Sequence, residues 1–330
     1  MARVELRSPE VSRLLLQKDK KMPAELTFDP DVFHGELTAN RAQVFVRVPR
    51  SPELADCTLH GFVHGPRCEF AHTLPAKYVL QDLGAGPTLL ARATITDPCL
   101  WSSDLPQIYD VHIELRRGSE VVAREQRMLG LRSIGVRASG EIVREGKIWV
   151  PRSVAVELLN QSSAADGSSV VDQLREALLV GTCTSPPLDL LVEASRRGAY
   201  LMVNLSAAQS DVEAALRGLA RWPAVMLVIV PDGEHCDRNL QQVAPNLLLA
   251  QPITAAELGA VTLAPWAALF VVDFTDHKQH AAPAKVPLLA MRSTSETLES
   301  AATGRAACDR LQRDLATSGQ FAGYLVAKSP

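Results

Sequence analysis

The sequence predicts an antiparallel Ig-like β-sandwich followed by a small (β/α)8 TIM-like barrel, a multidomain β plus α/β protein. Three observations predict it: the 330 residues exceed one ordinary domain, 47% of them are hydrophobic, and the apolar pattern changes period near Gly140. Short alternating strands precede this residue, and apolar strands alternating with helical segments follow it. We expect a polar leader with a short helix over residues 1–24, the sandwich over 25–138 and the barrel over 139–330.

The leader helix is predicted from Ser8-Pro9-Glu10, an N-cap residue followed by a first-turn proline. The sandwich is predicted from strands of alternating polarity, separated by turns rich in glycine and proline. These predicted strands are residues 43–48, 58–63, 89–95, 109–115 and 121–127.

The barrel is predicted from eight apolar segments that alternate with helical ones. Apolar strands with intervening helices are typical of a parallel sheet buried on both faces, and eight of them favour a barrel. The predicted strands are residues 148–150, 178–182, 200–205, 225–230, 247–250, 268–273, 287–291 and 321–326. The predicted helices are residues 169–177, 188–197, 210–221, 236–243, 255–259 and 304–317.

Composition and motifs argue against several classes of function. The formal net charge is −3 and the basic clusters are short, so we expect no nucleic-acid partner. No apolar run approaches the ~20 residues that span a bilayer and no signal-peptide core is found, so we expect no membrane partner and a cytoplasmic location. The six cysteines contain no Cys-x-x-Cys pair, so we expect thiols and no metal site. No phosphate-loop or dinucleotide motif implies a cofactor.

One segment resembles a known family. The stretch DPCLWSSDLPQIYDVHIEL at residues 97–115 is similar to the NPxLWSxxxPxLYxLxVxL segment that closes the Ig-like sandwich of family 2 glycoside hydrolases, the group of β-galactosidase, β-glucuronidase and β-mannosidase. Residues 129–134 resemble the family's GFRxIE strand, and residues 144–152 its LNGKPVxLRG segment. Weaker likenesses follow in the family's order through the barrel. We interpret Trp101 and Tyr109 as structural aromatics of the sandwich.

The resemblance implies two catalytic glutamates, a general acid/base after Asn at the end of the fourth barrel strand and a nucleophile at the end of the seventh. Retaining hydrolysis needs both, with their carboxyl groups ~5–5.5 Å apart. In this chain the first place reads Asp232-Gly233, and the second falls on Met291 or Arg292. Both glutamates are therefore expected to be replaced.

Two further departures point the same way. The family's second-strand Arg and His positions read Gly181 and Thr184. Residues 141–330 fall short of the roughly 200–250 residues of barrels whose sites are built from long βα loops. We therefore expect a family-2-like pseudoenzyme, a binding or assembly module whose partner is a carbohydrate or another protein. The alternative is an active glycosidase acting on a β-glycoside with relocated carboxylates.

For that alternative, the candidate catalytic residues are Asp232, Glu234, Asp273 and Glu296. All follow predicted strands, on the side of a barrel where chemistry occurs. Structural roles compete with the catalytic ones, and we favour the structural roles given next. Residues 231–233 read as a turn, with Glu234 as the N-terminal charge of the next helix. Residues 293–296 have the [ST]-x-x-E form of a capping box, in which Glu296 would close a helix start.

Overall fold

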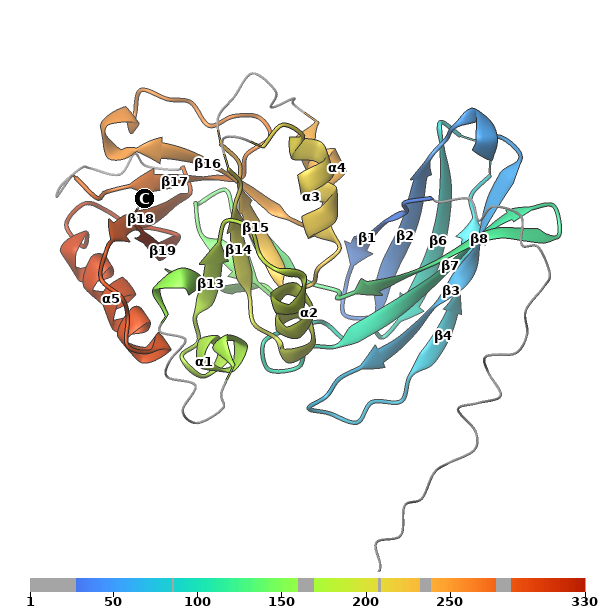
Figure 1. The fold of residues 1–330 in the computed structure, drawn as a ribbon, viewed down its shortest axis with the longest axis horizontal. Helices are drawn as coiled ribbons and strands as arrows, with labels where there is room; N and C mark the ends of the chain where they lie inside the picture. The colour runs from blue at the N-terminus through green and yellow to red at the C-terminus, as the bar shows by residue number, and fades with distance from the viewer. Residues whose placement is uncertain are drawn as a thin grey trace, which may run out of the picture.

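Figure 1 shows a β-sandwich and a barrel joined side by side. This computed structural model describes residues 28–329 except 85, 160–168, 207–208, 232–238 and 277–285. The leader predicted over residues 1–24 lies outside the described residues.

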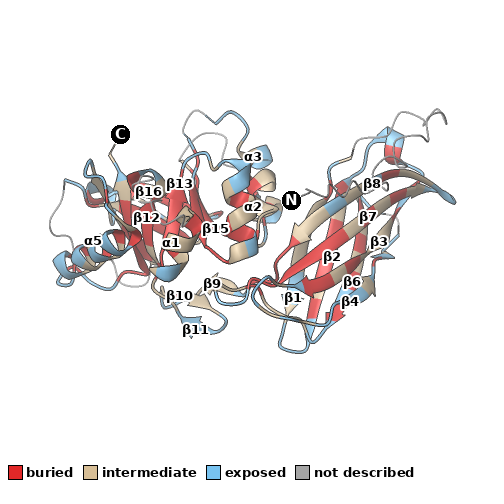
Figure 2. Ribbon diagram, turned by 60° about the horizontal axis from the view of Figure 1, so that its bottom comes forward, coloured by how far each residue is buried: buried red, intermediate tan, exposed pale blue. Residues whose placement is uncertain are grey.

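The sandwich has two antiparallel four-stranded sheets, ordered β1-β2-β6-β5 and β4-β3-β7-β8. Their strands are β1 (Asp31–Leu37), β2 (Arg41–Pro49), β3 (Cys57–Arg67), β4 (Ala76–Val79), β5 (Gln81–Asp82), β6 (Thr88–Thr96), β7 (Ile108–Arg117) and β8 (Glu120–Leu129). Buried and less buried positions alternate along β2 and β6, so each of these strands turns one side chain in two toward the core (Figure 2). All five predicted strands lie within β2, β3, β6, β7 and β8, so they are confirmed.

Three strands of the sandwich, β1, β4 and β5, were not predicted from the sequence. Each is the edge strand of its sheet. None of them contains a fully buried residue, and β5 has only two residues. Edge strands that bury little apolar surface carry no clear alternation of polarity, which is the pattern that the sequence reading depends on.

The second half is a closed barrel whose eight parallel strands follow one another in chain order, as predicted. They are β12 (Arg152–Ala155), β13 (Val180–Cys183), β14 (Leu201–Asn204), β15 (Val225–Ile229), β16 (Leu248–Thr254), β17 (Leu269–Asp273), β18 (Leu288–Thr294) and β19 (Gly323–Lys328). The ring closes where β12 pairs with β19. Every residue of β15 is buried, as expected for a strand covered on both faces.

The prediction that residues 148–150 form the first barrel strand is wrong. The barrel begins instead with β12, and residues 147–148 form β11 of a small antiparallel sheet. That sheet consists of β9 (Ile134–Val136), β10 (Ile142–Arg144) and β11 (Lys147–Ile148). Glu145 and Gly146 both have positive φ, 52° and 76°, so they form the tight turn of a hairpin. This turn folds β11 back onto β10 and keeps it out of the parallel ladder.

The helices around the barrel are short. They are α1 (Val170–Glu176), α2 (Leu188–Arg197), α3 (Val212–Ala220), α4 (Leu240–Val243) and α5 (Ala301–Asp314). Short 3-10 segments are η1 (Pro52–Leu54), η2 (Val156–Leu158) and η4 (Ala255–Glu257). The helix predicted over residues 255–259 is thus only a 3-10 turn, and α4 covers only the end of the one predicted over 236–243, of which 236–238 lie outside the described residues.

The capping box predicted at residues 293–296 is also wrong. Ser293 and Thr294 continue β18, because they pair with Ala327 and Lys328 of β19. The helix begins later, and the side chain of Ser300 accepts the N–H of Thr303 at its start. Glu296 therefore caps no helix.

Trp101 links the sandwich to the barrel. Only 1% of it is exposed, and it packs in the core of the barrel rather than in that of the sandwich, which corrects the expectation for this residue. Its indole Nε1 donates a hydrogen bond to the carbonyl of Ser195 in α2 (2.7 Å), and its ring meets that of Tyr200 edge-on (4.9 Å). Tyr109 is buried in the sandwich core, as expected, where its hydroxyl accepts the N–H of Cys99.

Arg132 forms a second link. Its guanidinium is buried, and burial lowers its pKa to about 10, so it stays charged at neutral pH. Nη1 donates to the carbonyl of Val225 (2.5 Å) and Nη2 to that of Asn246 (3.1 Å). Both carbonyls stand at the amino ends of neighbouring barrel strands, β15 and β16. One side chain of the sandwich thus holds two strands of the barrel.

His34 makes this junction sensitive to acid. Its backbone N–H and carbonyl both hydrogen-bond the side chain of Asn246 (2.9 Å each). Burial, together with the nearby charge of Arg132, lowers the pKa of the imidazole to about 4 from its ordinary 6.5. Between these values the unfolded chain binds a proton that the folded chain does not, so stability is lost as the pH falls from 6.5 toward 4.

We expect wild type to lose on the order of 1–3 kcal/mol more than His34→Gln over that interval. Urea unfolding at a series of pH values measures the difference. His72→Gln, which replaces an exposed histidine, should lose as much stability as wild type over the same pH interval. Parallel pH profiles for wild type and His34→Gln would contradict the assignment to His34.

Candidate functional site

Barrel enzymes place their catalytic groups at the carboxyl ends of the strands. Asp273 ends β17, and its Oδ1 accepts hydrogen bonds from the N–H (2.8 Å) and the hydroxyl (2.5 Å) of Thr275. The Oγ1 of Thr275 accepts in turn from the N–H of Ser293 on β18 (2.8 Å). This carboxylate therefore fixes a turn that ties two neighbouring strand ends together.

Glu296 follows β18 and is exposed. It lines a cavity of about 430 Å³ with Arg292 and Arg310. Its backbone N–H donates to the hydroxyl of Thr294 (3.1 Å). The other two candidate carboxylates, Asp232 and Glu234, lie outside the described residues.

The position expected for the nucleophile is occupied by packing and ion-pairing side chains. The Nη1 of Arg292 lies 2.6 Å from Oδ2 of Asp314 in α5, so its side chain points to the helical layer outside the barrel. Side chains alternate along a strand, so Met291 points to the other side, where it packs against the barrel core. The side chain that faces the barrel interior here is a thioether.

The two second-strand positions are occupied by a glycine and a threonine. Gly181 is buried in β13, and a Cβ built on it would lie only 2.8 Å from Cδ1 of Leu174. A side chain of any size has no room there. Thr184 follows the strand and is exposed.

Two cavities, of about 550 and 640 Å³, lie at the opposite, amino end of the barrel. Both are lined by Ile148, the last residue of β11, and by Val150, which follows it. Both are larger than the cavity at Glu296. These two cavities thus lie at the end of the barrel opposite to the one where barrel enzymes place their active sites.

Over the described part of the chain, no three His, Cys, Asp or Glu side chains gather in a way that suits a metal ion. In the same residues no helix has both the length and the apolar character needed to cross a bilayer. Five cysteines are free thiols, and Cys236 lies outside the described residues.

Comparison with known proteins places the fold. No family model and no curated protein matches the sequence. Solved structures do match: a glycosyl hydrolase family 2 member from Bacteroides cellulosilyticus has a TM-score of 0.58 at 14% identity, over 91% of this chain and 44% of that one. The β-glucuronidase of Bacteroides uniformis has a TM-score of 0.56 at 10% identity, over 90% and 45% of the two chains.

A putative β-galactosidase from Bacteroides fragilis gives a TM-score of 0.54 at 12% identity, over 90% of this chain and 54% of that one. The chain thus spans about half the length of these structures. Its fold is that of their sandwich and barrel, which confirms the fold implied by the sequence motif at residues 97–115.

Proposed function

We propose that the protein is a non-catalytic binding or assembly module built on the scaffold of family 2 glycoside hydrolases. The observation that carries this is in the middle of β18, where Met291 faces the barrel interior and Arg292 is paired with Asp314 at the place expected for the nucleophile. A thioether cannot attack an anomeric carbon or hold a covalent glycosyl intermediate.

Other features support the same proposal. Asp273 is bound in a turn by Thr275, and buried Gly181 leaves no room for a second-strand side chain. We infer that the partner is a carbohydrate or another protein, and that the protein works in the cytoplasm, in keeping with its free thiols.

The test is a hydrolysis assay. Pure protein is incubated with aryl β-galactosides, β-glucuronides, β-mannosides and β-glucosides, and we expect release of the aryl alcohol at the rate of buffer alone. Removing a catalytic carboxylate normally costs several kcal/mol of transition-state stabilisation, so an intact pair would give turnover far above that background. The β-glucuronidase of Bacteroides uniformis serves as the positive control.

Four variants assign any turnover that is found: Asp232→Asn, Glu234→Gln, Asp273→Asn and Glu296→Gln. Glu120→Gln, at an exposed residue of β8 in the sandwich, is the matched control. Turnover that one of the four variants abolishes and the control keeps would establish the alternative, an active glycosidase with relocated carboxylates.

A further inference from the structure

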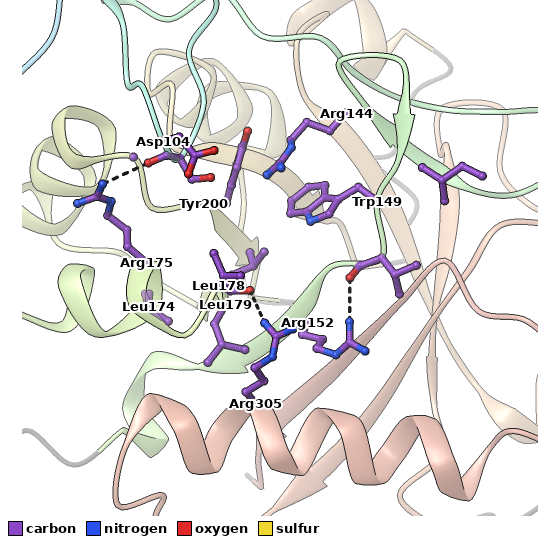
Figure 3. A pocket seen from close by; sticks show the side chains of 15 residues that line it. Asp104, Arg144, Trp149, Arg152, Leu174, Arg175, Leu178, Leu179, Tyr200 and Arg305 are labelled. Atoms are coloured by element: carbon purple, nitrogen blue, oxygen red, sulfur yellow. Dashed lines mark hydrogen bonds between the residues drawn. The ribbon is translucent and has the colours of Figure 1, made fainter. Parts of the chain in front are cut away.

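The cavity of about 550 Å³ lies where the small sheet meets the amino ends of the first barrel strands. Four arginines and one aspartate line it: Arg144, Arg152, Arg175, Arg305 and Asp104. Figure 3 shows that the arginines enter from different elements, which are β10, β12, α1 and α5. The cavity wall is therefore strongly cationic, and only the fold assembles it.

Two of the arginines are held by the barrel itself. Arg152 forms an ion pair through Nε with Asp309 of α5, and its Nη2 donates to the amide oxygen of Gln312 (2.7 Å). Arg305 donates through Nη1 to the carbonyl of Ala177 (2.8 Å), at the end of α1. These two side chains anchor α5 and α1 around the cavity.

The other two arginines are stacked on aromatic rings instead. The guanidinium of Arg144 lies 4.9 Å from the ring centre of Trp149 and 5.7 Å from that of Tyr200. Arg175 lies 4.4 Å from the ring centre of Phe70, and its buried Nε has no hydrogen-bond partner in the described structure. Neither has a carboxylate at ion-pairing distance among the described residues. Arg175 also donates through Nη2 to the carbonyl of Ser103 (3.3 Å). Stacking and this bond fix the plane of its guanidinium and leave its buried Nε without a partner.

The cavity also has an apolar rim. Ile148 and Leu178 line it with 57% and 67% of their surface exposed. Leu178 is held at a φ of 53°, in the left-handed region that leucine rarely adopts. This conformation ends α1, because the N–H of Leu178 donates to the carbonyl of Arg175 (3.0 Å) and that of Leu179 to the carbonyl of Leu174 (2.8 Å). The turn leaves the leucine side chain exposed beside the cationic wall, where it offers apolar surface.

We propose that this cavity binds a small organic phosphate, with the phosphate group on the Arg144 and Arg175 guanidinium groups and the organic part against Ile148 and Leu178. Guanidinium groups bind phosphate oxygens through paired, charge-assisted hydrogen bonds. The volume of about 550 Å³ is in the ~300–1,000 Å³ range of small-molecule sites. This inference goes beyond the proposed function, because the cavity is at the barrel end opposite Asp273 and Met291.

The test is isothermal titration of the full chain with phenyl phosphate, inorganic phosphate and benzyl alcohol. We expect phenyl phosphate to bind most tightly, inorganic phosphate more weakly and benzyl alcohol not at all. Arg144→Gln and Arg175→Gln should each weaken phenyl phosphate binding by about 10-fold or more. Asp104→Asn should tighten it, because it removes the negative charge from the wall. Arg124→Gln, an exposed arginine of the sandwich, should leave it unchanged.

Circular dichroism and thermal unfolding establish that each variant is folded. If Arg175→Gln does not fold, the other two variants test the proposal. Arg144→Gln should weaken phenyl phosphate binding and Asp104→Asn should tighten it. Absence of saturable phenyl phosphate binding by wild type would overturn the proposal, as would equal losses in Arg144→Gln and Arg124→Gln. Because these readouts involve no hydrolysis, their failure leaves the outcome of the glycoside assay untouched.

Discussion

Replacing Trp101 with alanine is expected to lower the free energy of unfolding by about 3–5 kcal/mol, the usual cost of truncating a buried tryptophan. Its indole is 1% exposed and packs edge-on against Tyr200. It also serves the end of α2: Ser195 lies in the last turn of that helix, whose final four carbonyls have no donor within the helix. Nε1 of Trp101 supplies that donor.

Urea unfolding measures this loss of stability. Trp101→Phe separates the contribution of ring packing from that of the hydrogen bond to Ser195. Phenylalanine keeps a buried ring but leaves the Ser195 carbonyl unpaired, so we expect a smaller loss, with about 1–3 kcal/mol from the hydrogen bond. Trp222→Ala, which truncates a less buried tryptophan, should cost less than Trp101→Ala. A cost for Trp101→Ala no larger than that for Trp222→Ala would contradict the role given to Trp101.

The fold was predictable from sequence wherever burial dictated the residue pattern. The barrel strands are buried on both faces, so they appear as apolar runs such as Val225–Ile229. The inner strands of the sandwich alternate cleanly, as β2 does. The errors fall where burial is weak or misleading: three edge strands were missed, and the apolar run at residues 148–150 was assigned to the barrel although a hairpin turn at Glu145 and Gly146 folds it away.

The candidate site was predictable only in part. The placement of Met291 and Arg292 where the family motif has its nucleophilic glutamate follows from the sequence, and it stays a prediction. The sequence does not show which of these two side chains faces the barrel interior, because that depends on the pairing of Arg292 with Asp314 on a helix that follows later in the chain.

The cationic cavity had no sequence signal at all. Its four arginines lie on four elements, from Arg144 to Arg305, and each looks like an ordinary surface residue. Only the closure of the barrel and the position of the small sheet bring them to one wall. A site of this kind leaves no motif, because no two of its arginines are neighbours in the sequence.

Arg132→Met is the sharpest test of the junction between sandwich and barrel, because two effects oppose each other there. Burying a guanidinium without a carboxylate partner is unfavourable, which is why its pKa falls to about 10. Against this stand its bonds to the carbonyls of Val225 and Asn246, and a charged donor contributes about 1.5–3 kcal/mol per bond. Methionine fills similar space but leaves both carbonyls without a donor.

We expect the two bonds to outweigh the cost of burying the charge, so Arg132→Met should lower the free energy of unfolding by about 2–4 kcal/mol. Arg132→Lys should lower the free energy of unfolding by at least half as much, because a compact ammonium group cannot reproduce the planar guanidinium that donates to two strands. Arg124→Met, at an exposed arginine of β8, should stay within about 0.5 kcal/mol of wild type in the same urea titration. Should Arg132→Met prove more stable than wild type, the desolvation of the charge would be the larger effect, and Arg132 would orient the two halves at the expense of stability rather than hold them together.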